Sequence, residues 1–395
     1  MESAKTRPPK PPHPKHPPTA GNILLVANWD SNVGYAWWLM ESFWVAISEH
    51  FGEQRHSVLA FPSISVLPEA IANANIQTEQ CAFSWENHPT SLSEQLEFIR
   101  KHQCEVMYLS DFPLYSLRYL AYRAAGIKKI IIHDHAPGQR SPATGLKRLL
   151  KKTLLSIKPI SADAVIATSE YIHKRHLESS CIPAKRCYTA ANGLPEAEAG
   201  IKPADLEKMF GIAKDKTVML TTGRANTYKG IDFAIRCIAE LQKYNKAENL
   251  HYLFCGDGPD LEYFKTLAKE LDVASRITFA GRQENIGAII KATHFAIHPS
   301  KGEVGYSLSI LEYMQAGLPV IVPNNPSVCE ATEHRVSGLI YQENNINECC
   351  EAIDLYASSA EQTAIMGKNA RLAIQQQYSL SNTHKALIEA FEKTL

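Results

Sequence analysis

A carboxylate, Glu312, lies about one helical turn inside a stretch of the chain whose residue types suit an anion-binding site. The apolar run 295–297 indicates a buried strand, and the loop after it contains Gly305, where a ligand could approach the main chain closely. Ser307 could cap a helix, and a helix N-terminus attracts anions through its free N–H groups and its dipole. A carboxylate beside such a site is unfavourable unless it binds another group, and a ribose diol fits.

This stretch resembles the donor-site signature of the GT-B glycosyltransferases of family 4, a retaining family that uses nucleotide-sugar donors. In that family an acidic residue precedes a glycine–aromatic–glycine loop, and a second glutamate follows on a helix near the pattern Ala-x-Gly-x-Pro-Val. The chain matches the pattern at 305–308 (Gly-Tyr-Ser-Leu), at Glu312 and at 316–320 (Ala-Gly-Leu-Pro-Val). It departs from the pattern at Val304, which stands where the family has its first acidic residue, while Glu303 lies one position earlier.

The resemblance implies that this loop binds the donor and that Glu312 holds its ribose hydroxyls. If the loop bulges toward the sugar, the Glu303 carboxylate would act on the positive charge that develops at the anomeric carbon. If the loop follows the usual path, Val304 faces the sugar, Glu303 points into solvent, and main-chain N–H groups near the loop glycine make the contact. The loop residues expected to bind the donor are Gly305, Tyr306, Ser307 and Leu308.

Two cations, Arg224 and Lys229, are five residues apart across a turn that follows the expected strand 217–222. Fixed cations beside a helix N-terminus suit a diphosphate, and a solvated loop with chance basic residues is the alternative. The family has a Gly-Arg and Lys-Gly pair at this spacing, which favours the diphosphate site without a metal ion. Residues 279–282, which include Arg282, resemble the family's loop that holds the nucleobase.

The first half of the chain opens with a strand at 22–27, a loop that contains Gly34, and a helix from about 35 to 51. This order is typical of a nucleotide-type half-domain. In the resembled family the equivalent loop faces the donor phosphates and the acceptor. The helix carries four large aromatic residues, for which core packing is the default and an acceptor-facing role for one or two is the alternative. They are Trp37, Trp38, Phe43 and Trp44.

His133 and His135 lie two residues apart at the end of the expected strand 129–133, so on a strand they would share a face. A metal pair would need a third ligand, and none is near in the sequence. A solvated loop pair is a second alternative. The resemblance supplies a third, because family members often carry a histidine followed by aspartate at this strand end, pointing at the sugar. His133 with Asp134 matches that step.

Short apolar strands alternate with helical segments throughout, which predicts parallel, doubly wound sheets. With 395 residues, roughly two domains are expected. We expect an α/β protein of two facing Rossmann-like lobes, as in GT-B folds, at 21–195 and 204–380, joined by a linker at 196–203. A final helical run at 381–395 could cross back to the first lobe. Residues 1–20 are Pro-rich and basic and predict a disordered tail.

The composition of the chain argues against several classes of function and location. Lys and Arg number 41, as do Asp and Glu, so the zero net charge argues against a nucleic-acid partner. Nine scattered cysteines show no metal-type pairing and favour a reduced, cytoplasmic setting. No apolar run reaches the length of a membrane span, and the N-terminal segment lacks the apolar core of a secretory signal.

Residues 146–158 contain a basic amphipathic segment. Its leucines and Ile157 recur on one helical face, and basic residues flank them. A helix of this kind can lie on an anionic membrane surface, whereas a sheet-covering helix with a solvated basic face is the alternative. The basic residues are Lys147, Arg148, Lys151 and Lys152.

Together these patterns predict a retaining, metal-independent hexosyltransferase without a cofactor. It would move a hexose-type sugar from a UDP- or GDP-linked donor to a glycan or lipid-linked acceptor, in polysaccharide or glycoconjugate biosynthesis. The enzyme would be cytoplasmic, with peripheral attachment to the inner face of the membrane as an option. Catalytic roles are expected for His133 and Glu303. The alternatives are an epimerase or phosphorylase on the same fold, or a non-catalytic protein that binds a nucleotide-sugar.

Overall fold

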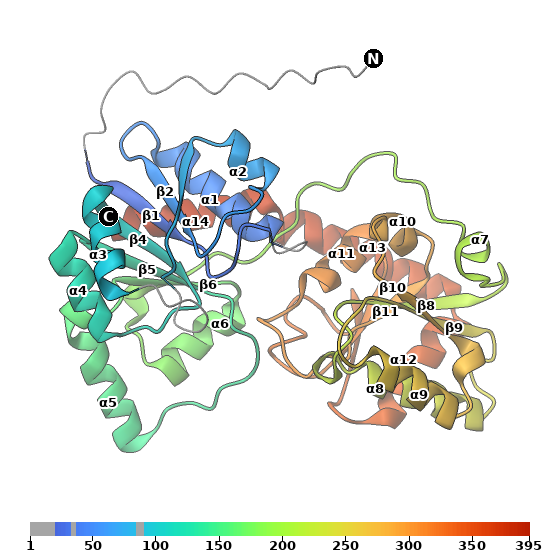
Figure 1. Cartoon of the computed structure of the whole chain (residues 1–395). Coiled ribbons are helices and arrows are strands. Elements are labelled where there is room, and N and C mark those ends of the chain that lie inside the picture. The colour runs from blue at the N-terminus through green and yellow to red at the C-terminus, as the bar shows by residue number, and fades with distance from the viewer. Residues whose placement is uncertain (1–19, 33–36, 84–90) are drawn as a thin grey trace, which may run out of the picture.

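A computed structural model describes residues 20–32, 37–83 and 91–395 of the chain. Residues 1–19 of the expected tail at 1–20, and the loop glycine Gly34, lie outside these residues. The described chain forms two α/β lobes, each built on a parallel sheet (Figure 1). The expectation of two facing doubly wound lobes is thereby confirmed.

The N-terminal lobe contains a seven-stranded parallel sheet in the order β3-β2-β1-β4-β5-β6-β7. Its central strands form where runs of Ile, Leu, Val and Ala are buried on both faces, as in other parallel sheets, whereas the edge strand β3 is polar and partly exposed. The strands are β1 Asn22–Val26, β2 Ser57–Phe61, β3 Ile76–Gln80, β4 Cys104–Ser110, β5 Lys129–Asp134, β6 Ala164–Ala167 and β7 Cys187–Thr189. The helices are α1 Trp38–Phe51, α2 Glu69–Asn73, α3 Leu92–Lys101, α4 Leu117–Ala125, α5 Gly145–Ser156 and α6 Glu170–Arg175.

Helices cover both faces of this sheet. Residues of α3 and α4 pack on one face, for example Phe98 and Tyr122. Residues of α1 and α14 (Leu380–Thr394) pack on the other, for example Phe43 and Phe391. The strand order reverses between β1 and β4, and ligands of such sheets bind outside the carboxyl ends of the strands at this position.

The C-terminal lobe contains a six-stranded parallel sheet in the order β10-β9-β8-β11-β12-β13. Its strands are β8 Thr217–Thr222, β9 Leu250–Cys255, β10 Ile277–Gly281, β11 Phe295–Ile297, β12 Val320–Pro323 and β13 Gly338–Tyr341. Its helices are α7 Leu206–Phe210, α8 Ile231–Lys243, α9 Leu261–Glu270, α10 Ile286–Lys291, α11 Leu308–Ala316, α12 Ile346–Ser358 and α13 Ala360–Gln377.

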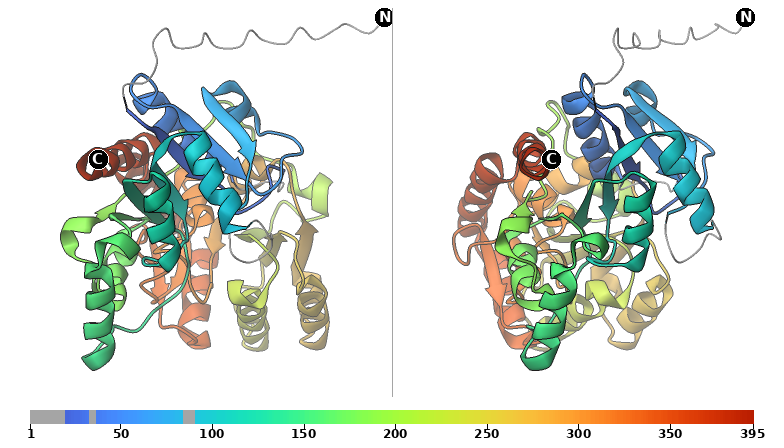
Figure 2. Two further views of the ribbon diagram at one scale, coloured as in Figure 1. Left: turned by 60° about the vertical axis from the view of Figure 1, so that its left-hand side comes forward. Right: turned by 90° about the vertical axis from the view of Figure 1, so that its left-hand side faces the viewer.

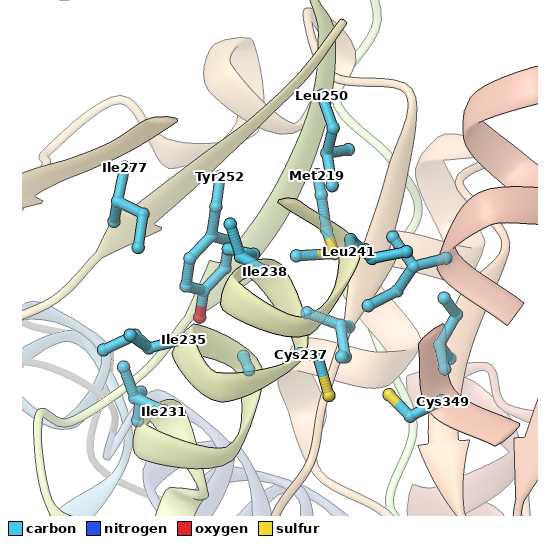
Figure 3. Close-up of a cluster of buried hydrophobic side chains, with 14 of the residues drawn as sticks. Met219, Ile231, Ile235, Cys237, Ile238, Leu241, Leu250, Tyr252, Ile277 and Cys349 are labelled. Carbon is cyan, nitrogen blue, oxygen red and sulfur yellow. The ribbon is translucent and has the colours of Figure 1, made fainter. Parts of the chain in front are cut away.

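The core of this lobe lies between α8 and the sheet. Ile231, Ile235 and Ile238 recur at helical spacing and face Met219 and Tyr252 of the central strands (Figure 3). All five side chains are buried. This packing fixes α8 against the strand ends, and with it the turn between β8 and α8, where donor-binding residues are expected.

The chain returns to the N-terminal lobe in α14 (Figure 1 and Figure 2). There Phe391 packs against Phe51 with ring centroids 5.9 Å apart. The outgoing and returning segments lie side by side. The N–H of Leu194 donates to the carbonyl of Tyr378 at 2.9 Å, and the N–H of Leu380 donates to the carbonyl of Leu194 at 2.7 Å. The C-terminal lobe is therefore connected to the other lobe by two hydrogen-bonded crossing segments.

Candidate active site

A cavity of about 930 Å³ lies at the carboxyl ends of the C-terminal strands. Three loops line it, at 222–224, 255–259 and 282–286, together with the first turns of α11. Trp38 of α1 reaches it from the N-terminal lobe. The volume lies in the range of small-molecule sites, and a nucleotide-sized ligand fits it.

Three charged residues singled out from the sequence meet in this cavity. Arg224 follows β8, Arg282 follows β10, and Glu312 lies on α11. Burial raises the pKa of the Glu312 carboxyl to about 7. No hydrogen bond or ion pair to this carboxyl exists among the described residues. Hydroxyl groups that donate to it would favour its ionised form, so Glu312 suits a ligand with a diol.

The start of α11 has the expected cap, because Ser307 Oγ accepts a hydrogen bond from the N–H of Ile310 at 3.2 Å. The side chain of Leu308 lines the cavity. Since the Ser307 hydroxyl is occupied by the cap, a contact between Ser307 and a donor would have to come from its main chain or from a second bond of the hydroxyl.

Gly305 has a different environment from the one expected. Its φ of 107° lies in the left-handed region, and its N–H donates to the carbonyl of Ser327 at 2.8 Å. A Cβ at this position would lie 2.5 Å from Ser169 Oγ and 2.6 Å from a carboxylate oxygen of Glu330. The close approach therefore serves the contact between the lobes, and the Gly305 N–H is already engaged and not available to the donor.

Tyr306 is buried between the lobes. Its hydroxyl lies 3.0 Å from the carbonyl oxygen of Asn192 and 3.3 Å from that of Thr168, both in the N-terminal lobe. Its side chain is therefore committed to the lobe contact and does not line the cavity. The sequence pattern could not reveal this, because both partners are more than a hundred residues away in the chain.

Glu303 forms an ion pair with Lys229 and is not solvent-exposed. One carboxylate oxygen, Oε1, lies 2.5 Å from Lys229 Nζ and 2.9 Å from His298 Nε2. Burial would raise the pKa of this carboxyl, but His298 and Lys229 more than offset it and lower the pKa to about 2. The placement of Glu303 in solvent is therefore wrong, since only 8% of the residue is exposed. Its contact with the sugar stays a prediction, as does the contact of Lys229 with the diphosphate.

His133 is fully buried at the end of β5, and its Nδ1 lies 2.6 Å from the Tyr108 hydroxyl. Burial, together with the nearby His135, lowers the pKa of this imidazole well below its ordinary value, so it is neutral. Its Nε2 has no hydrogen-bond partner among the described residues. Asp134 instead pairs with Arg175 at 2.8 Å and anchors the fold. In the part of the chain that the structure describes, no group of three or more His, Cys, Asp or Glu side chains could hold a metal ion.

The aromatic residues around α1 divide into two groups. Phe43 and Trp44 are fully buried in the N-terminal core, as the default predicts. Trp37 is half-buried and stacks on Trp29 with ring centroids 3.9 Å apart, and Trp38 lines the donor-side cavity. Trp38 was singled out from the sequence only as a core or acceptor-facing aromatic, and not as a residue of the donor-side cavity. The turn 255–259 is a part of the site that sequence reasoning missed, and its position after strand β9 was the only signal.

Helix α5 does not cover the sheet along its whole length. Leu146, Leu149 and Leu150 are 71%, 61% and 54% exposed, and Leu155 is the buried residue of the helix. The helix lies at the lower outer edge of the N-terminal lobe (Figure 1). The sheet-covering alternative therefore fails for the first two turns. No helix of the described residues is long and apolar enough to cross a membrane.

Two facing doubly wound lobes with a cavity at the strand ends define the GT-B class of folds, and solved structures agree. A glycosyltransferase from Rickettsia africae ESF-5 superposes with a TM-score of 0.73 at 16% identity, over 95% of this chain and 98% of that one. The HepE protein of Anabaena, solved in complex with UDP-glucose, has a TM-score of 0.72 at 15% identity, over 94% and 99% of the two chains.

The sequence comparisons match the C-terminal lobe to a family. Residues 204–373 match the model of the family described as glycosyl transferases group 1. An uncharacterized glycosyltransferase of Haemophilus influenzae is 31% identical over 160 residues, which are 40% of this chain and 44% of the relative's length. The resemblance inferred from the motifs is thus confirmed: the chain has the GT-B fold, and its C-terminal lobe carries the group 1 glycosyltransferase domain.

Proposed function

We propose that the protein is a retaining glycosyltransferase that moves a hexose-type sugar from a UDP- or GDP-linked donor to a glycan or lipid-linked acceptor. The observation that carries the proposal is the cavity in which Arg224 and Arg282 accompany Glu312 near the N-terminus of α11. Cations and the positive end of the helix suit a diphosphate, and the carboxyl group suits the ribose. Together these residues would hold a nucleotide-sugar at its ribose and at its diphosphate leaving group.

The reaction would proceed by displacement on one face of the sugar. The bond between the anomeric carbon and the diphosphate oxygen breaks, and a bond from the acceptor oxygen forms on the same face. The acceptor proton passes to an oxygen of the leaving diphosphate. Arg224 and the dipole of α11 stabilise the negative charge on this leaving group, so fixed cations perform the task that a metal ion performs elsewhere.

His133 and Glu303 are proposed to act on the sugar side of this reaction. His133 is neutral, and with Nδ1 beside the Tyr108 hydroxyl its Nε2 can carry a proton for a sugar hydroxyl. Glu303 is ionised, and its second carboxylate oxygen accepts no hydrogen bond among the described residues. A negative charge held there would stabilise positive charge on the anomeric carbon.

The acceptor is proposed to reach the enzyme at an anionic membrane surface. Exposed leucines on α5 offer apolar area, and Lys147, Arg148 and Lys152 beside them offer positive charge. Leu117 and Leu120 of the neighbouring α4 are also exposed, at 78% and 52%. This surface supports a lipid-linked acceptor and a place in glycoconjugate biosynthesis on the cytoplasmic face.

A mass-spectrometric screen of UDP- and GDP-hexoses tests the proposal. We expect one donor to release its nucleoside diphosphate, and NMR of the product to show the donor's anomeric configuration. Binding without turnover across donors and acceptors would favour a non-catalytic binding protein. An altered free sugar nucleotide, or release that depends on inorganic phosphate, would favour an epimerase or a phosphorylase.

A further inference from the structure

We propose that His298 is a positioning residue, which holds Glu303 in place while Lys229 turns from this carboxylate to the donor diphosphate. The inference rests on the proposed function, because it assigns Lys229 a diphosphate ligand. It concerns a histidine that directly follows β11. His298, Glu303 and Lys229 are not among the residues that line the cavity, so Lys229 would have to turn toward it to reach a donor.

Both partners of Glu303 meet the same oxygen. Lys229 Nζ and His298 Nε2 lie 2.5 Å and 2.9 Å from Oε1. The main chain of Glu303 is fixed too, because its carbonyl accepts a hydrogen bond from the N–H of Gly138 at 2.9 Å. The contact between the lobes therefore fixes the main chain of Glu303, and the hydrogen bond from His298 holds its carboxylate oxygen.

The two partners differ in freedom. His298 is buried, and its main-chain N–H donates to the carbonyl of Ile321 at 2.9 Å, which fixes the residue in the sheet. The Lys229 side chain is 24% exposed and has four rotatable bonds beyond a main chain fixed by Asn226. Of the two donors to Glu303, Lys229 is the one that can turn to an incoming anion.

A buried carboxylate that loses all its donors is strongly unfavourable. If Lys229 alone held Glu303, its transfer to a diphosphate would leave such a carboxylate, and that cost would oppose donor binding. With His298 present, one charge-assisted hydrogen bond remains on Oε1 during the transfer. Burial, the largest influence, lowers the pKa of His298, so its imidazole is neutral and Nε2 carries the hydrogen that Glu303 accepts.

Binding of UDP and GDP to the full-length protein tests this role by calorimetry. We expect His298→Ala to weaken binding about 10- to 100-fold, the loss of one charge-assisted hydrogen bond. His298→Gln keeps an N–H donor and should retain most of the affinity. His294→Gln is the matched control, because His294 accepts from the N–H of Val218 and has no contact with Glu303. An affinity of His298→Ala within twofold of the unchanged protein would overturn the proposal.

A second experiment makes His298→Ala in a protein that already carries Lys229→Met. It distinguishes a positioning role of His298 from a general destabilisation of the fold. In Lys229→Met the donor loses its cation, so adding His298→Ala should reduce UDP or GDP affinity little further. Two independent losses that simply multiply would show that His298 acts on the fold and not through Lys229, and would overturn the proposal. The kinetic counterpart is a raised KM for the donor with a smaller change in kcat.

Urea unfolding without any nucleotide tests the roles of Lys229 and His298 independently of the donor. Urea unfolding of Lys229→Met, His298→Ala and the double variant should show a loss of stability greater than the sum of the single losses, because Glu303 then has no donor. In a Glu303→Gln background this excess should vanish. If the unchanged protein binds neither UDP nor GDP, the proposed donor fails, and the unfolding cycle alone decides whether Lys229 and His298 share Glu303. Simple additivity there would overturn the inference.

Discussion

The carboxylate of Glu330 in the C-terminal lobe accepts a hydrogen bond of 2.7 Å from the main-chain N–H of Tyr171, at the first turn of α6 in the N-terminal lobe. Its other oxygen accepts from the N–H of Glu170 at 3.0 Å. The same carboxylate lies against Gly305, so the contact between the lobes is made beside the loop that leads into α11. Closure of the lobes and the shape of that loop are therefore linked.

Glu330→Gln should loosen this contact, because an amide offers one acceptor oxygen and brings an N–H₂ group toward two main-chain donors. We expect a stability loss of about 1–3 kcal/mol in urea unfolding and faster hydrogen exchange at residues 169–172. Glu333→Gln, at a nearby exposed position, is the control. Unchanged exchange at 169–172 would contradict the assigned role of Glu330.

Glu312 should make stability depend on pH in a defined direction. Burial raises the pKa of this carboxyl from 4.5 to about 7, so between these values the folded protein binds a proton that the unfolded chain does not. The stability that it contributes is complete below about pH 4.5 and is lost as the pH rises through about 7. Relative to Glu312→Gln, the unchanged protein should lose about 1–3 kcal/mol over this window. A difference that stays flat over this window would refute the burial of this charge.

Arg224→Ala should remove a charge-assisted contact with the donor diphosphate. We expect kcat/KM to fall about 10- to 100-fold, which corresponds to about 1.5–3 kcal/mol, while the circular dichroism spectrum stays unchanged. Arg236→Ala, on the exposed face of α8, serves as the control. Donor kinetics of Arg224→Ala equal to those of the control would remove Arg224 from the diphosphate site.

Chelation should leave activity intact, because Arg224, Arg282 and the N-terminus of α11 are expected to stabilise the leaving diphosphate without a metal ion. The measurement is donor turnover before and after dialysis against EDTA. Loss of activity with EDTA and its recovery with Mg²⁺ or Mn²⁺ would show that the fixed cations are insufficient.

The exposed basic face of α5 should recruit the protein to anionic vesicles, less so at high salt. Replacing Lys147, Arg148 and Lys152 with Gln should weaken co-sedimentation, at about 1 kcal/mol per charge. Lys151 is left in place because its ammonium donates to the carbonyl of Ser179. A triple change to Gln at Lys269, Lys368 and Lys385, exposed lysines on other helices, is the control. No recruitment at low salt would favour a soluble acceptor.

Much of the fold follows from the sequence because its strands are apolar runs buried on both faces. The runs at 217–222 and 129–133 lie where strands β8 and β5 do. The strands left unpredicted are β3, whose sequence IQTEQ is polar, and β13, which has four residues. Both lie at sheet edges. At its edge β3 is partly exposed and needs no apolar run, whereas β13 is apolar and largely buried but too short to give a clear pattern.

Less of the candidate site than of the fold could be predicted from the sequence. Motif spacing predicted Arg224, Arg282 and Glu312, because the two arginines follow strands and Glu312 lies about one turn into α11, all within short local motifs. The Tyr306 hydroxyl binds the carbonyl groups of Asn192 and Thr168. These residues are distant in the sequence, so no local pattern could predict the contacts. The His298–Glu303 pair is only five residues apart, but the loop conformation that joins them appears only in three dimensions.

The two crossing segments joined at Leu194 have a consequence for synthesis. Leu387 and Phe391 of α14 complete the core of the N-terminal lobe, yet they follow the whole C-terminal lobe in the chain. On the ribosome, the N-terminal lobe therefore exposes the uncovered face of α1 until the C-terminal lobe has emerged. The C-terminal lobe is an inserted domain whose entry and exit points are hydrogen-bonded neighbours, so it can fold as a closed unit before its host is finished.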